Sequence, residues 1–125
     1  MAGVVVPATV VGVSICYLAI DVGGVKLAAA VVSEQGEVLV RDRIATPQRE
    51  VWPALSRLVL RVMAAAPTPP VGCGVGCGGP MNPAERTVSP LYIPSWKAFP
   101  LAAEVEALTQ LPTVVDNNGK SVALG

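Results

Sequence analysis

An acid beside a pair of glycines is the first feature of this chain that could do chemistry. Asp21 interrupts an apolar run, Gly23 and Gly24 follow it, and a second apolar run begins after Lys26. Glycines let backbone N–H groups approach a ligand closely, and such turns can bind phosphate oxygens. A carboxylate at the same turn can hold a metal ion bound to that phosphate. The segment therefore predicts a phosphate and metal site, with an ordinary β-hairpin as the alternative interpretation.

Two further segments with polar or glycine residues follow apolar runs downstream. The glycines of residues 78–79 come after the apolar run 71–77, and the polar residues 116–118 come after the short run 113–115. Ligands of α/β sheets bind at the carboxyl ends of strands. We therefore expect both segments to share one sheet edge with Asp21 and to form a ligand site there.

The hydrophobic pattern predicts a meander of three strands, followed by alternating helices and strands. The expected elements are strands 17–22, 26–33, 37–43, 71–77 and 113–116, helices 51–62, 101–108 and 119–124, and a long ordered loop over 78–100. A loop of that length inside a compact domain is usually functional. The order favours the α/β class, with a mixed sheet in which parallel strands follow the β-meander and helices flank the sheet.

The composition is that of a single apolar domain. The chain has 125 residues, of which 52% are hydrophobic, and its nine basic and nine acidic residues cancel. It lacks the clustered Lys and Arg of nucleic-acid-binding proteins, so we expect no nucleic-acid partner. Residues 1–20 carry no charge, but Pro7 and Gly12 interrupt them and no basic region precedes them. We expect an apolar N-terminal extension over residues 1–16 and no membrane span.

The three cysteines are expected to be free thiols. In a strand, Cys73 and Cys77 would lie ~13 Å apart, which is too far for a disulfide. Free thiols indicate a reducing compartment, so we expect a cytoplasmic protein. The chain contains no histidine, and a zinc site would need more ligands than the cysteines supply, so no resident metal site is expected.

Three glycines match the spacing of a dinucleotide-binding fingerprint, but the residues around them do not. Gly74, Gly76 and Gly79 have the required intervals, but the fingerprint must open a helix. Pro80 and Pro83 follow immediately and prevent a helix from starting. The sequence therefore argues against a Rossmann site.

Four segments, in the same order and at similar spacing, resemble the ROK (repressor, ORF, kinase) family. They are AIDVGGVKLAAAVV (19–32), GCGVGCGGPM (72–81), VSPLYIPSWKAFPL (88–101) and LPTVVDNNGKSVALG (111–125). The resemblance implies the actin-like ATPase fold, of ribonuclease H type, and makes residues 17–125 the N-terminal lobe of a two-lobed sugar kinase. It also implies glucokinase-like phosphorylation of a hexose, with ATP and Mg²⁺ as cofactors.

The resemblance assigns the first turn to the nucleotide. The family pattern Asp-x-Gly-Gly-Thr-Lys maps to Asp21, Gly23, Gly24, Val25 and Lys26, and this loop would face the ATP phosphates and Mg²⁺. Val25 departs from the pattern, because it replaces a threonine and removes a hydroxyl near the phosphates.

The resemblance assigns the later segments to the sugar. The residues expected at the sugar are Gly78, Gly79, Tyr92, Asn117 and Asn118. Tyr92 stands where kinase members tend to have an asparagine that faces the sugar.

The most serious departure from the family pattern is at the catalytic position. Asn118 occupies the place of the aspartate that accepts the sugar's hydroxyl proton, and an amide cannot accept it. The loss of a positioned general base costs about 10²–10⁴-fold in rate. Asp116, two residues earlier, is a conceivable substitute.

The chain ends before the second lobe that ROK kinases need, so we expect a truncated chain that is inactive by itself. The family's DNA-binding segment is also not found, which argues against a repressor. The alternatives are a catalytically dead module that binds a sugar or a partner, and a gene remnant whose product barely folds. An apolar face left uncovered by the second lobe predicts self-association into a homo-oligomer.

Overall fold

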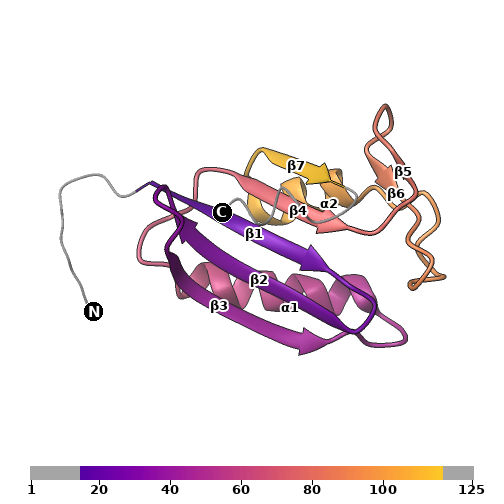
Figure 1. Ribbon diagram of the computed structural model, residues 1–125, viewed down its shortest axis with the longest axis horizontal. Coiled ribbons are helices and arrows are strands. Elements are labelled where there is room, and N and C mark those ends of the chain that lie inside the picture. The colour runs from indigo at the N-terminus through magenta and orange to yellow at the C-terminus, as the bar shows by residue number, and fades with distance from the viewer. Residues whose placement is uncertain (1–14, 117–125) are drawn as a thin grey trace.

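The computed structural model describes residues 15–116, which form one mixed sheet, a small hairpin and two helices (Figure 1). The strands of the main sheet are β1 (Cys16–Val22), β2 (Lys26–Ser33), β3 (Val38–Ala45), β4 (Cys73–Cys77) and β7 (Thr113–Asp116). The helices are α1 (Val51–Ala64) and α2 (Leu101–Thr109), and the hairpin pairs β5 (Met81–Asn82) with β6 (Thr87–Val88).

The main sheet has the strand order β3-β2-β1-β4-β7. The β1–β2 and β2–β3 pairs are antiparallel, whereas the β1–β4 and β4–β7 pairs are parallel. The predicted meander followed by parallel strands is therefore confirmed. The arrangement puts β1 at the centre, with β2 on one side and β4 on the other.

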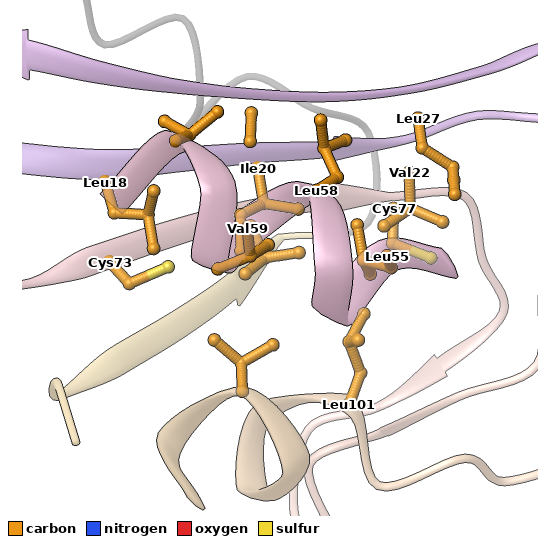
Figure 2. Close-up of a cluster of buried hydrophobic side chains, with 14 of the residues drawn as sticks. Leu18, Ile20, Val22, Leu27, Leu55, Leu58, Val59, Cys73, Cys77 and Leu101 are labelled. Atoms are coloured by element: carbon orange, nitrogen blue, oxygen red, sulfur yellow. The ribbon is translucent and has the colours of Figure 1, made fainter. Parts of the chain in front are cut away.

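One face of the sheet packs against both helices. Alternate residues of β1, such as Leu18 and Ile20, are buried on this face. They belong to one apolar cluster with Leu58 of α1 and Leu101 of α2, as Figure 2 shows. Because a strand alternates its side chains between two faces, this burial fixes which residues lie on the other side.

The opposite face, here called the open face, carries the intervening residues. Ala19 and Asp21 of β1 lie on it, next to Gly74 and Gly76 of β4. No helix within residues 15–116 packs on this face, and Val114 of β7 is 67% exposed there. Ala19 and Gly76 on the same face are buried, so the exposed apolar face that the sequence predicted, and self-association through it, stay predictions.

The structure corrects three element boundaries. β4 begins at Cys73, because Val71 is half exposed and its N–H donates to the Cys16 carbonyl just before the strand starts. β3 continues to Ala45 because its pairing with β2 extends to Lys26. The segment expected as one long loop contains the β5–β6 hairpin, whose turn is held by a bond from the Glu85 N–H to the Asn82 side chain. The helix predicted over 119–124 lies outside the described residues.

All three cysteines are free thiols, as predicted, and all are buried. Burial raises the pKa of Cys73 to about 12 and that of Cys77 to about 11, from an ordinary value of 9.0. Only the thiolate is nucleophilic.

We therefore expect slow alkylation of Cys77 by iodoacetamide in the folded protein. At pH 8 its thiolate population should be about 100-fold smaller than that of an ordinary thiol. Mass spectrometry of peptides labelled for increasing times, with and without urea, measures the difference. Equal labelling rates in the two conditions would contradict the buried position.

The helices of the described segment are too short for a bilayer. Neither α1 nor α2 combines the length and hydropathy that a membrane-spanning helix requires.

Candidate functional site at the carboxyl ends of the parallel strands

Two carboxylates face the same side of the sheet where its parallel strands end. Asp21 of β1 pairs with Gly76 of β4, and Gly76 pairs in turn with Asp116 of β7. The two acids therefore lie on the open face, two strand spacings apart, roughly 10 Å between their Cα atoms. Gly76, which lies between them in the sheet, has no side chain.

The β1–β2 turn brings Lys26 to the same edge. The Gly23 N–H donates to the Lys26 carbonyl at 3.0 Å, and a Cβ on Gly23 would come within 2.9 Å of that oxygen. Glycine is therefore required at this position. Lys26 is exposed and, by strand alternation, lies on the same face as Asp21.

Thr46 supports this turn from outside it. Its hydroxyl donates to the Gly23 carbonyl at 2.8 Å, and its N–H donates to the Val25 carbonyl at 2.9 Å. Sequence reasoning missed Thr46, because it follows β3 and nothing in its local pattern indicates a contact with the turn. Val25, where the sequence predicted a loss of a phosphate-facing hydroxyl, is 79% exposed.

Tyr92 joins the turn to the glycine segment after β4. Its hydroxyl donates to the Val22 carbonyl at 2.8 Å and accepts from the Gly78 N–H at 2.7 Å. These two hydrogen bonds are called the Tyr92 bridge below. Burial raises the pKa of the Tyr92 hydroxyl above its ordinary value of 10.0. The hydroxyl therefore keeps its proton at neutral pH and can donate to Val22.

Aromatic packing holds the segment that carries Tyr92. The rings of Trp96 and Phe99 stack with their centroids 4.1 Å apart. The ring of Phe99 also lies tilted against that of Trp52 in α1, with the centroids 5.8 Å apart. Val88 and Phe99 exchange backbone hydrogen bonds across the base of the segment. The loop that the sequence marked as functional is thus anchored at its base and reaches the site through Tyr92.

A charged contact ties the hairpin to the far strand of the sheet. Arg86, in the β5–β6 turn, donates from two nitrogens to the Glu106 carboxylate at 3.0 and 2.6 Å and to the Thr113 carbonyl at 2.9 Å. The Thr113 N–H donates back to Glu106 at 3.3 Å. This contact was not predicted from the sequence, because its three residues lie on separate elements.

The contact makes stability depend on pH through Glu106. Its hydrogen bonds with Arg86 lower its pKa below the ordinary 4.5. A group with a depressed folded-state pKa stabilises the fold above its unfolded pKa, and this contribution is lost as the pH falls through the folded value. We expect Glu106→Gln to lower the urea midpoint slightly at pH 7 and not at pH 2. The effect is small because Arg86 is exposed and Glu106 only half-buried, and solvent weakens such pairs.

Glu85→Gln, in the same hairpin, removes an equal charge and serves as the control. Urea unfolding of both variants at the two pH values checks the expectation. If Glu85→Gln lowers the midpoint at pH 7 as much as Glu106→Gln does, the effect belongs to net charge and not to this contact.

One cavity of the described residues lies elsewhere on the open face. It measures about 640 Å³ and is lined at the amino ends of the parallel strands by residues such as Tyr17, Gly72 and Val114. None of the residues predicted for the site lines it. The described part of the predicted site thus lies outside this cavity.

The structure brings together only part of the predicted site. Asp21, the two glycines of the turn, Lys26, Gly78, Gly79 and Tyr92 gather at one edge. Asn117 and Asn118, predicted at the sugar and at the catalytic position, lie outside the described residues.

Comparison with known proteins assigns the family. The family model described as "ROK family" matches residues 17–125. The chain belongs to the ROK family. It is 32% identical over 115 residues to a glucokinase of Streptomyces coelicolor and to an N-acetylmannosamine kinase of Yersinia pseudotuberculosis, and covers 34% and 37% of their lengths. The aligned parts amount to 86% and 85% of this chain. The chain thus spans about a third of the curated relatives it matches.

Solved ROK structures share the fold. A ROK hexokinase from Thermus thermophilus matches with a TM-score of 0.73 and 26% identity, over 82% of this chain and 35% of its own. A ROK glucokinase from Streptomyces griseus, in complex with glucose and AMPPNP, matches with a TM-score of 0.67 and 30% identity, over 82% of this chain and 33% of its own. The predicted actin-like ATPase fold of ROK sugar kinases is therefore confirmed.

The described residues of this ROK chain fit a magnesium-bound phosphate. Mg²⁺ is usually held by one or two carboxylates together with substrate phosphates, and Asp21 is exposed beside a glycine turn and a lysine. Within residues 15–116 no cluster of three or more His, Cys, Asp or Glu side chains forms. A metal here would thus rely on the phosphates for part of its coordination.

Proposed function

We propose that this chain carries the sugar-binding and phosphate-binding lobe of an ATP-dependent hexose kinase of glucokinase type. The observation that carries the proposal is the exposed Asp21 at the glycine turn, on one sheet edge with Gly78 and Asp116. The 32% identity to a glucokinase supports the same substrate class. Since the chain covers only 34% of that enzyme, the activity of the whole protein is part of the proposal.

Each residue of the edge has a role in the proposal. Asp21 would hold Mg²⁺, and Lys26 together with the N–H groups of the turn would face the phosphate oxygens of ATP. Mg²⁺, when bound, would neutralise charge on the transferred phosphate. Gly78 and Gly79 would approach the sugar with backbone groups, and Asn117 and Asn118 are further proposed sugar contacts.

The proposed chemistry depends mostly on positioning. Phosphoryl transfer needs alignment and charge stabilisation more than covalent chemistry from the protein. The remaining requirement is a group that accepts the proton of the attacking sugar hydroxyl. Asn118 can orient that hydroxyl through its amide oxygen but cannot accept the proton. We therefore propose that this chain by itself transfers no phosphate.

A second candidate function is a sugar-binding module without catalysis. The amide at position 118 favours it, because it can hydrogen-bond a sugar hydroxyl but cannot accept its proton. In this function the chain would bind a hexose or a protein partner.

We further propose action in the cytoplasm. Three buried free thiols support a reducing compartment. The exposed Val114 and the open face around it support self-association.

Calorimetry and a phosphorylation assay test the proposal together. The purified chain is titrated with glucose, mannose and N-acetylmannosamine, and sugar phosphate is measured in the presence of ATP and Mg²⁺. We expect binding of at least one sugar and no sugar phosphate. Asn117→Ala should abolish the binding, whereas Gln48→Ala, an exposed position after β3, should not.

Two outcomes would contradict these proposals. Formation of sugar phosphate by the pure chain would contradict its proposed inactivity and the module. Failure of every hexose to bind would contradict both the kinase lobe and the sugar-binding module.

A further inference from the structure

The Tyr92 bridge links the carboxyl ends of two neighbouring parallel strands. Val22 is the last residue of β1, and Gly78 follows the last residue of β4. Both backbone groups bond to one hydroxyl, over distances of 2.8 and 2.7 Å. A side chain from another segment thus occupies the N–H of Gly78 and one lone pair of the Val22 carbonyl at the proposed ligand edge.

The Tyr92 ring covers two of the glycines on which the proposed site rests. A Cβ on Gly24 would lie 3.1 Å from the Tyr92 Cβ and Cγ atoms. A Cβ on Gly78 would lie 2.6 Å from the Tyr92 hydroxyl oxygen and 2.7 Å from Cε2. The close approach that glycine permits at these positions is therefore made by Tyr92 itself.

The hydroxyl of Tyr92 has the same hydrogen-bonding chemistry as a sugar hydroxyl. Each has one proton to donate and lone pairs to accept. In the bridge the single proton goes to Val22 and one lone pair receives the Gly78 N–H. A sugar hydroxyl placed at this point would make the same two bonds, so the two hydroxyls exclude each other.

We propose that Tyr92 determines specificity at this site as an internal competitor for one sugar hydroxyl. The inference rests on the proposed hexose function. A hexose that uses Val22 and Gly78 must displace the Tyr92 hydroxyl, and its affinity is reduced by the loss of the bridge. Tyr92 is 41% exposed, so the ring can turn toward solvent without leaving the surface of the fold.

Tyr92→Phe is the variant that tests this. It keeps the ring on Gly24 and removes only the hydroxyl, so the fold should be retained. The matched control is Leu91→Ala, because Leu91 precedes Tyr92 in the same loop and is 84% exposed. Thermal unfolding of all three proteins verifies that the fold is kept.

The first measurement needs no ligand. Amide hydrogen exchange by NMR should be at least tenfold faster at Gly78 in Tyr92→Phe than in the wild type, since an amide is protected by its hydrogen bond. Leu91→Ala should leave the rate unchanged. Unchanged exchange at Gly78 in Tyr92→Phe would overturn the bridge and the proposal with it.

The second measurement is calorimetry with glucose, mannose and N-acetylmannosamine. We expect at least one of them to bind Tyr92→Phe about tenfold more tightly than the wild type. A tenfold change in affinity corresponds to the net free energy of one or two hydrogen bonds. Equal or weaker binding by Tyr92→Phe would overturn the competitor role and make Tyr92 a supporting residue. If none of the three sugars binds any of the proteins while Gly78 exchange is faster in Tyr92→Phe, the hexose function fails and the bridge stands.

Discussion

Replacing Asn118 with aspartate is expected to raise phosphoryl transfer by about 10²-fold or more in a chain extended by a ROK second lobe. The new carboxylate would accept the proton of the attacking sugar hydroxyl, which the amide cannot do. The KM for the sugar should change less, because the asparagine already hydrogen-bonds a hydroxyl through its carbonyl oxygen. Steady-state kinetics with glucose and ATP measures both quantities, and Val25→Thr, which restores a hydroxyl near the phosphates, should raise the rate further.

Asn82→Asp is the control, because it makes the same chemical change in the β5–β6 hairpin. Asn118 precedes Gly119, a pair prone to deamidation, so mass spectrometry must establish that fresh protein contains asparagine. If the Asn118→Asp variant still binds sugar and ATP but transfers phosphate at an unchanged rate, the role assigned to this position is wrong. Asp116 then becomes the residue to replace.

Leu58→Ala is expected to lower the free energy of unfolding by ~2–5 kcal/mol, the usual cost of removing a buried leucine side chain. Leu58 is fully buried in α1, between the sheet and the rest of the core (Figure 2). Neighbours packed at this density relax only partly into the space that the smaller side chain leaves. Urea unfolding followed by circular dichroism measures the change.

Leu60→Ala gives a matched comparison within the same helix. Leu60 is 48% exposed, so its replacement should change the free energy of unfolding by only ~0.5 kcal/mol. Similar urea midpoints for the two variants would show that α1 does not pack through the face that carries Leu58.

The sheet and its site edge were predictable because they depend on local patterns. Alternation in β1 sets Leu18 and Ile20 on the buried face and Asp21 on the other, and the glycine pair specifies a tight turn. Parallel strands place their carboxyl ends together. The positions of Asp21 and Asp116 at one sheet edge, two strands apart, follow from these rules without knowledge of any side-chain contact.

The contacts that complete the site were not predictable, because they join residues far apart in sequence. Tyr92 reaches the carbonyl of Val22 across 70 positions, and Arg86 reaches Glu106 across 20. Neither contact leaves a periodic signal. The β5–β6 hairpin escaped prediction for a related reason, since strands of two residues are too short for alternation to be recognised.

The central position of β1 has a consequence for the synthesis of the chain. One edge of β1 pairs with β2, which follows after a short turn. Its other edge pairs with β4, which is synthesised about fifty residues later. At synthesis rates of about 5–20 residues per second, that edge stays unpaired for roughly 3–10 s. Unpaired strand edges recruit other chains. The meander formed early on the ribosome is thus the stage at which aggregation competes most directly with folding, and it ends only when β4 docks beside Asp21.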